Sequence, residues 1–247
     1  MKQLQLLLTI FFICAALSAQ AQTIFTDRPN VTDAVDPIPK GRFQTEIGFL
    51  FSEDDESGIK SMQLPNLSFK YGIVDWLEMR VITSYNRFSD IPPSDGSLTG
   101  LSPITFSPKM ALTEQNGIVP NSALVANFTF PNLGSEAFDV PEFQGGLTGL
   151  FEYTWGKVTW TNSLGRLYTC DCDWSYTTVV GTSFTDKLGG FVEFYGNLTG
   201  NATLNYDVGV TYLVSDNLQV DAIYGNTAED PGFYFFGFGL AWKTELK

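Results

Sequence analysis

The sequence predicts an all-β protein: a single antiparallel transmembrane β-barrel of about 12 strands, which follows a cleaved signal peptide. Three observations support this fold class. Charged residues make up 17% of the 247 residues and aromatic residues 15%, whereas soluble domains carry about 25% charged residues. Runs of roughly ten residues alternate apolar and polar side chains between turn signals. Beyond the N-terminal region no stretch is apolar for long enough to form a transmembrane helix, so strands closed into a barrel are the way left to cross a bilayer.

Residues 1–21 have the three parts of a secretory signal peptide. Lys2 supplies the positive n-region, residues 6–17 the apolar h-region, and Ala19-Gln-Ala21 a cleavage site of small residues. The apolar run is too short to span a bilayer as a helix. We therefore expect export after cleavage, with a lipoprotein signal at Cys14 as the alternative.

The exported chain is acidic and has no histidine. The whole sequence has a net charge of −13, and removal of the signal peptide with Lys2 makes it −14. Nucleic acid is not an expected partner because its recognition needs basic surface. Without a histidine, neither the usual general base nor a mixed Cys/His metal site is available. We predict no enzyme, no cofactor and no metal, and interpret Cys170-Asp-Cys172 as two free thiols or a small local disulfide.

Each alternating run is predicted to be one strand, which gives twelve strands. The clearest run sets Leu204, Tyr206 and Val208 on one face against Asn205 and Asp207 on the other. The twelve predicted strands are residues 42–51, 65–73, 77–86, 104–113, 123–130, 145–155, 157–168, 175–185, 188–198, 203–214, 218–225 and 233–242.

The connections between these strands are of two alternating kinds. Tight turns, such as Val74-Asp75 and Gly156-Lys157, alternate with mostly longer, acidic loops, such as residues 52–60 and 89–102. This alternation is typical of outer-membrane barrels, with short periplasmic turns, long extracellular loops and both termini in the periplasm. We therefore predict one barrel domain over residues 41–247, in the outer membrane of a Gram-negative bacterium.

A soluble β-sandwich also alternates in this way and is the structural rival. Two features favour the barrel: the opposite face is too charged for a dry core, and aromatic residues collect near both ends of the apolar face, as interfacial girdles do. The girdle residues are Tyr71, Trp76, Trp155, Trp160 and Trp242 beside the short turns, and Tyr85, Tyr168, Trp174 and Tyr224 beside the long loops.

If the apolar face meets lipid, charged residues line the lumen. A barrel of twelve strands is wider than the kind that side chains fill, and narrower than a general porin. Two interpretations stay open: a hydrated, salt-bridged filling that supports the wall, or a narrow polar path that favours cations or hydroxylated solutes. The predicted lumen residues are Arg42, Glu46, Lys70, Glu78, Arg80 and Lys109 from the first strands, and Glu152, Glu193, Asp207 and Asp221 from the later ones.

Residues 22–40 form a leader that precedes the first strand, and its prolines exclude it from a sheet interior. We expect one of two arrangements. Either the leader folds to the periplasmic mouth or into the lumen as a partial plug, with Asp27 and Arg28 paired to charges such as Arg80 and Glu46, or it is a flexible periplasmic tail.

Six segments of the mature chain carry a resemblance to a known family: Thr26-Asp-Arg-Pro-Asn30, Pro39-Lys-Gly-Arg-Phe-Gln44, Glu46-Ile-Gly-Phe49, Tyr71-Gly-Ile-Val-Asp-Trp-Leu-Glu78, Ser215-Asp-Asn-Leu-Gln-Val-Asp221 and Phe235-Phe-Gly-Phe-Gly-Leu-Ala-Trp242. They resemble the bacterial outer-membrane barrel proteins named for the meta-pathway of phenol degradation. The chain departs from many such barrels at its end, where Lys243 to Lys247 follow the last aromatic residue.

The resemblance implies a barrel with a role in uptake of small, often aromatic or hydrophobic compounds, and it carries over no site residues. The predicted function is an outer-membrane channel or facilitator for passive passage of small solutes through a narrow polar lumen. The alternative is a closed structural or surface-interaction barrel that acts through its acidic extracellular loops. Expected partners are outer-membrane lipid, lipopolysaccharide and a small-molecule solute.

Overall fold

The computed structural model describes residues 24–91, 96–168, 174–199, 202–230 and 232–245. The predicted signal peptide and the Cys170–Cys172 pair lie outside these residues. Within the described part, the strands are β1 (Arg42–Asp54), β2 (Lys60–Val74), β3 (Leu77–Ile91), β4 (Gly96–Leu101), β5 (Thr105–Thr113), β6 (Asn121–Thr129), β7 (Gln144–Trp155), β8 (Val158–Tyr168), β9 (Trp174–Ser183), β10 (Leu188–Asn197), β11 (Asn205–Ser215), β12 (Leu218–Thr227) and β13 (Phe233–Glu245).

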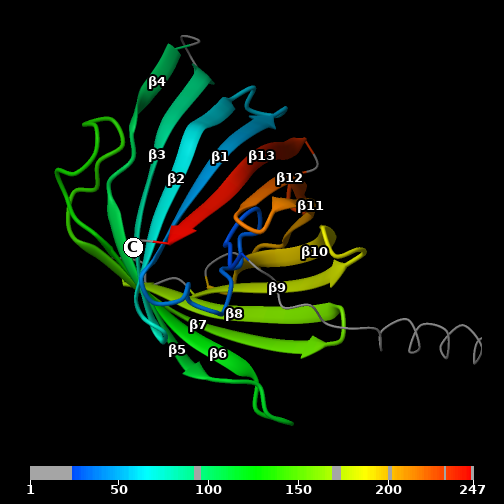
Figure 1. The fold of residues 1–247 in the computed structure, drawn as a ribbon. Coiled ribbons are helices and arrows are strands. Elements are labelled where there is room, and N and C mark those ends of the chain that lie inside the picture. The colour runs from blue at the N-terminus through cyan, green and yellow to red at the C-terminus, as the bar shows by residue number, and fades with distance from the viewer. Residues whose placement is uncertain (1–23, 92–95, 169–173, 200–201, 231, 246–247) are drawn as a thin grey trace, which may run out of the picture.

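The strands form one closed antiparallel barrel (Figure 1). Strands that follow each other in the chain pair, except β4 and β5, and β1 pairs with β13 to close the ring, from Arg42 opposite Glu245 to Asp54 opposite Phe233. β3 is shared: its first half pairs with β5 and its second half with β4. β4 and β5 therefore occupy one position in the wall, and the described residues make a barrel of 12 strands, as predicted.

Two loops that the sequence predicted are partly strand. The segment 89–102 contains β4, and its Ser-, Pro- and Gly-rich composition predicted a loop. This short strand forms because it pairs with the far end of β3. β2 begins at Lys60, five residues before the predicted start at Pro65. Its pairing with β3 shifts register between Gln63 and Asn66, and a bulge of this kind accommodates a proline, which has no N–H to donate.

The two faces of the wall differ as the alternation predicted. On β11, Val208, Val210 and Tyr212 point outward and are 46–49% exposed, whereas Asp207, directly before Val208, points inward and is fully buried. The girdle residues Trp76 and Trp155, beside the short turns, are both 53% exposed. An apolar outer face with aromatic ends is the surface that a bilayer requires. Among the described residues, no helix is long and apolar enough to cross a membrane.

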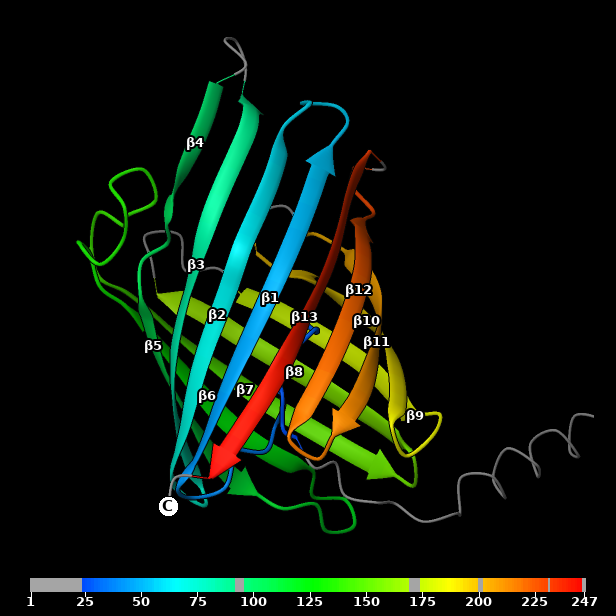
Figure 2. The same ribbon diagram turned by 45° about the horizontal axis from the view of Figure 1, so that its top comes forward.

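The leader enters the ring of strands (Figures 1 and 2, dark blue). It starts at Ile24, reaches into the lumen and returns to the short-turn end, where the backbone N–H of Gly41 donates to the carbonyl of Gly72 at 2.8 Å. Gly41 has φ +73°, in the left-handed region that favours glycine, and this turn leads the chain into β1. The lumen is therefore occupied by residues 24–40.

Candidate functional site

The leader and the inner wall together form the candidate functional site. Apolar leader residues give it a core of its own: Ile24, Val35 and Ile38 are at most 2% exposed. Val35 packs with the inward-facing Ala123 and Val125. Alternation between polar and apolar residues did not reveal this contact, because small apolar residues on the lumen side of β6 interrupt the expected polar face.

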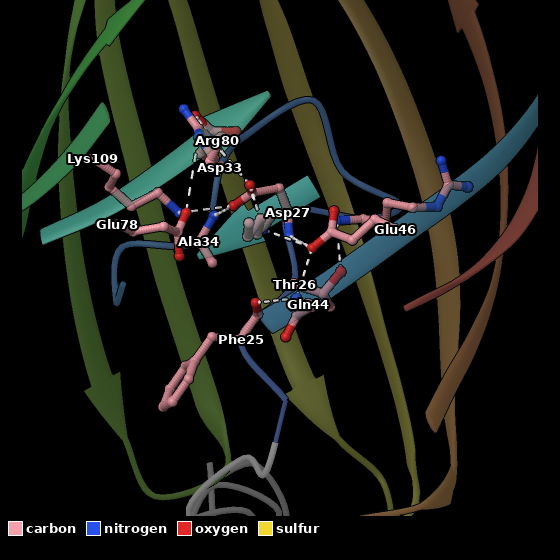
Figure 3. Close-up of polar contacts among 12 residues, drawn as sticks. Phe25, Thr26, Asp27, Asp33, Ala34, Gln44, Glu46, Glu78, Arg80 and Lys109 are labelled. Atoms are coloured by element: carbon pink, nitrogen blue, oxygen red, sulfur yellow. Dashed lines mark hydrogen bonds and ion pairs between the residues drawn. The ribbon is translucent and has the colours of Figure 1, made fainter. Parts of the chain in front are cut away.

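Asp27 is the centre of the polar contacts inside the barrel (Figure 3). Its carboxylate lies 2.5 Å from Lys70 Nζ, 2.9 Å from Arg80 Nη1 and 2.9 Å from Lys109 Nζ. These three cations come from β2, β3 and β5, and their side chains are at most 1% exposed. A buried charge is destabilising unless it is paired, so one leader carboxylate serves three wall residues.

One further carboxylate, that of Glu46, completes this group. We call it the Asp27 cluster: Asp27, Glu46, Lys70, Arg80 and Lys109. Glu46 lies 2.6 Å from Lys70 Nζ and accepts the backbone N–H of Asp27 at 3.2 Å. Around the cluster, Asp33 Oδ2 lies 2.9 Å from Arg80 Nη1, Glu78 accepts the backbone N–H of Ile38 at 2.8 Å, and Gln44 donates to the carbonyl of Phe25 at 2.7 Å.

Arg28 is held on the other side of the lumen. Its Nη2 lies 3.0 Å from Asp221 Oδ1 on β12. Its guanidinium also fills a slot between Gly48 of β1 and Gly239 of β13 (the Arg28 slot): a Cβ at Gly48 would lie 1.8 Å from Arg28 Nη1, and one at Gly239 2.5 Å from Nη2. At Gly48 the three atoms nearest to the added Cβ all belong to the guanidinium, whereas at Gly239 the Cβ would also lie 2.4 Å from the backbone carbonyl oxygen of Ile47.

Glu193 binds the tip of the leader. Its carboxylate accepts the backbone N–H groups of Val31 and Thr32, both at 2.8 Å, and the hydroxyl of Thr32. The Thr32 hydroxyl also lies 2.5 Å from that of Thr177 on β9. Asp207 of β11 is paired directly opposite Glu193 of β10 and is fully buried. The leader is thus bonded to strands on both halves of the barrel.

The remaining predicted lumen residues lie nearer the short turns. Glu152 accepts the hydroxyl of Thr161 at 2.7 Å. Arg42 is the first residue of β1, and its backbone N–H donates to the carbonyl of Pro39 at 3.1 Å.

A cavity of about 510 Å³ lies on the long-loop side of the leader. Its floor is formed by residues of the leader together with Glu46 and Arg80 of the Asp27 cluster. Its wall combines apolar side chains with polar ones from the long-loop halves of the strands. The lining includes Arg28, Asn30, Asp33, Leu50, Gln63, Asn66, Ile82, Tyr195, Asn205, Ile223, Phe233 and Phe235. We call this cavity the vestibule.

The sequence predicted partners for Asp27 and Arg28 but did not assign them correctly in every case. Asp27 contacts Arg80, one of the partners expected, and Arg28 pairs with Asp221, a lumen carboxylate of the kind expected, although not with Glu46 itself. Asp33, Thr32, the Arg28 slot and the vestibule were not foreseen. An inward-facing glycine at position 48, in a strand of otherwise large residues, was the available signal for the slot.

The pKa of Asp27 predicts how the docked leader responds to acid. Burial alone would raise the pKa of Asp27, but Lys109, Lys70 and Arg80 lower it well below its ordinary value of 3.8. When the leader is released, the pKa of Asp27 returns to that ordinary value. The contribution of Asp27 to the free energy of leader docking is therefore complete above pH 3.8, and it is lost as the pH falls toward the depressed pKa of the docked state.

The measurement is the mobility of a nitroxide on Val31→Cys, in a chain that carries Cys170→Ser and Cys172→Ser. We expect an immobile label from about pH 8 to about pH 5 and a growing mobile fraction only below the ordinary pKa of Asp27. Asp27→Asn removes the carboxylate that three buried cations share and leaves them only Glu46, Asp33 and Glu78, at a cost of roughly 3–5 kcal/mol, and should make the label mobile at neutral pH. An immobile label in Asp27→Asn would contradict the role given to this carboxylate.

Gly48→Ala should displace Arg28 from its slot without unfolding the barrel, because the group that the new methyl meets is the far end of a flexible side chain. We expect a mobile fraction of the same label and a loss of about 1–3 kcal/mol in the free energy of leader docking. Gly145→Ala is the matched control, since its Cβ would meet nothing closer than 3.5 Å. Equal spectra for the two variants would mean that the slot does not hold the leader.

Comparison with solved structures shows the same fold in known outer-membrane proteins. The COG4313 outer membrane channel from Pseudomonas putida F1 aligns with a TM-score of 0.66 and 14% identity, over 87% of this chain and 100% of that one. The NanC porin aligns with a TM-score of 0.56 and 6% identity, over 80% and 100%, and the KdgM porin with 0.53 and 9%, over 80% and 98%. At these identities the likeness establishes the fold alone.

Among curated proteins, none matches the sequence. The family model described as "Putative MetA-pathway of phenol degradation" matches residues 26–244 of the 247, a match that begins within the leader and reaches every strand of the barrel. With the barrel and its aromatic girdles, this match confirms the predicted family and the predicted location in the outer membrane of a Gram-negative bacterium. The chain belongs to the family of outer-membrane barrels that this model describes.

Proposed function

We propose that the protein is an outer-membrane channel or facilitator for passive passage of small solutes, and that its leader is a partial plug. The observation that carries the proposal is the vestibule of about 510 Å³ that ends on the docked leader. A barrel that served only as a structural wall would need no such cavity, whereas a facilitator needs a place where a solute collects before the lumen opens.

The contacts of the leader suit a plug that can leave. They are ion pairs and hydrogen bonds to side chains and to the leader backbone, together with a small apolar contact at Val35. Polar groups of this kind can exchange the leader for water, because the lumen residues are hydrated once the leader has moved. Among the charged wall residues that the sequence predicted for the lumen, six are carboxylates and four are Lys or Arg. An open lumen should therefore favour the passage of cations over that of anions.

The composition of the vestibule favours aromatic or hydrophobic solutes that carry a polar group. Phe233, Phe235 and Ile223 supply apolar surface, and Asn66, Asn205 and Tyr195 supply hydrogen-bonding groups. Ligand sites commonly combine a mainly apolar wall with a few polar groups that orient the ligand. This proposed solute class rests on the lining of the vestibule alone.

A disulfide can test whether the leader closes the lumen. The hydroxyls of Thr32 and Thr177 lie 2.5 Å apart, so the pair Thr32→Cys and Thr177→Cys is suited to a disulfide in the Cys170→Ser, Cys172→Ser background. In planar bilayers we expect rare, small openings from the oxidised protein and at least several-fold more conductance after reduction. The single variant Thr32→Cys should not respond to the reductant.

Two results would contradict the proposal. Equal conductance before and after reduction, with the cross-link verified, would show that the leader does not control the path. Silence in both states from a folded barrel would favour the closed barrel that acts through its extracellular loops.

The vestibule itself is tested by block of the current with phenol as the probe. Phenol added on the extracellular side of the reduced protein should lower the ion current, and Phe235→Ala should weaken this block several-fold, since Phe235 lines the vestibule. The matched control is Phe236→Ala, whose side chain is the next along β13 and is 46% exposed on the outer face. Equal block in both variants would exclude the vestibule as the site of solute binding.

A further inference from the structure

The short turn between β5 and β6 is unusually apolar for a periplasmic turn. Ile118 is 92% exposed and Val119 is 42% exposed. The conformation of the turn is defined: Asn116 and Val119 donate their backbone N–H groups to each other's carbonyls at 3.0 Å, and Gly117 adopts φ +59°. A large aliphatic side chain is thus presented to the surroundings by a structured turn.

The turn is fixed against the outer side of β7. Gln115 donates to the carbonyl of Thr154 at 3.1 Å and accepts its backbone N–H at 2.7 Å. The hydroxyl of Tyr153 donates to the carbonyl of Ile118 at 2.7 Å. Tyr153 lies on the same face of β7 as the outward-facing Phe151 and Trp155, and it stacks on Trp155 with ring centroids 5.4 Å apart. The backbone of Ile118 is therefore held beside the lipid-facing side of the wall.

The apolar girdle continues on both sides of this turn, at the lower rim of the barrel in Figure 2. The backbone N–H of Ala111 donates to the carbonyl of Trp76, which links the start of β3 to β5. Tyr153 stands opposite Trp160, which links β7 to β8. The exposed apolar residues along this rim are Trp76 (53%), Leu112 (56%), Ile118 (92%), Val119 (42%), Trp155 (53%) and Trp160 (41%).

We propose that the β5–β6 turn inserts Ile118 and Val119 into the phospholipid interface of the periplasmic leaflet and anchors the barrel there. Continuity with the lipid-facing girdle identifies the occupant as lipid. The turn, residues 114–120, contains no lysine or arginine and has one charged residue, Glu114. Removal of a fully exposed isoleucine from water is favourable, and a rigid turn loses little conformational entropy when it inserts.

The test uses a nitroxide at Ile118→Cys in the full mature chain with Cys170→Ser and Cys172→Ser, in nanodiscs of phosphatidylethanolamine and phosphatidylglycerol. Collisions with oxygen, which partitions into lipid, are compared with collisions with a water-soluble nickel chelate. The controls are Val210→Cys in the middle of the outer face and Asp216→Cys on the short turn between β11 and β12. We expect the label at 118 to be protected from the nickel chelate at least several-fold relative to the label at 216, and to collide with oxygen as the label at 210 does.

Each other outcome overturns the proposal. A label at 118 as accessible to the nickel chelate as the label at 216 would place the turn in water. Low accessibility to both reagents would indicate a protein contact with a second copy of the chain. A second variant, Ile118→Asp, should lower the folded-to-unfolded ratio in vesicles by roughly tenfold, with little change in detergent micelles, and an unchanged ratio in vesicles would also contradict the anchor.

Discussion

The carboxylate of Asp27 is the contact on which the inside of this barrel depends. Lys70, Arg80 and Lys109 project from β2, β3 and β5 into a space where they are almost fully buried. The wall supplies Glu46 and Glu78 near them, which is one negative charge too few. Three cations in a poorly hydrated interior repel each other and lose their hydration, so they require further anions. Asp27 and Asp33 of the leader provide these anions, and the leader is therefore part of the interior of the barrel.

In the function that we propose, this electrostatic arrangement also sets the conditions for passage. Release of the leader means separating Asp27 from one half of the wall, Arg28 from Asp221, and the backbone of Val31 and Thr32 from Glu193. These contacts lie on opposite sides of the lumen, so the loss of one leaves the others in place. A plug held in this way is stable at rest, while each of its polar partners can be satisfied by water when it moves. The vestibule borders the same residues, so a solute bound there, as we propose, would lie next to the groups that hold the leader.

The sequence predicted the barrel well because the information needed is local. A strand in a membrane wall alternates with a period of two, and that alternation assigned the outward and inward faces of β11 and β12 residue by residue. It failed where another effect hides the period. β4 is short and lies in a segment rich in turn residues, and β2 continues through Pro65 by means of a bulge. The first error is a missed strand and the second a misplaced strand start, and both depend on how far the neighbouring strand β3 extends.

The composition and the period of the chain determined the fold class, the lipid-facing residues, the family and the presence of lumen charges, since each of these follows from short-range pattern. Only the tertiary structure decided which charges meet. Arg28 and Asp221 are 193 residues apart, and their contact depends on the register of every strand between them. The Arg28 slot depends on the same register, because Gly48 and Gly239 are directly opposite each other only once β1 pairs with β13. Alternation determines the face of the wall on which a side chain lies. Its position along the barrel axis depends on the register between strands and on barrel closure, and an ion pair requires both.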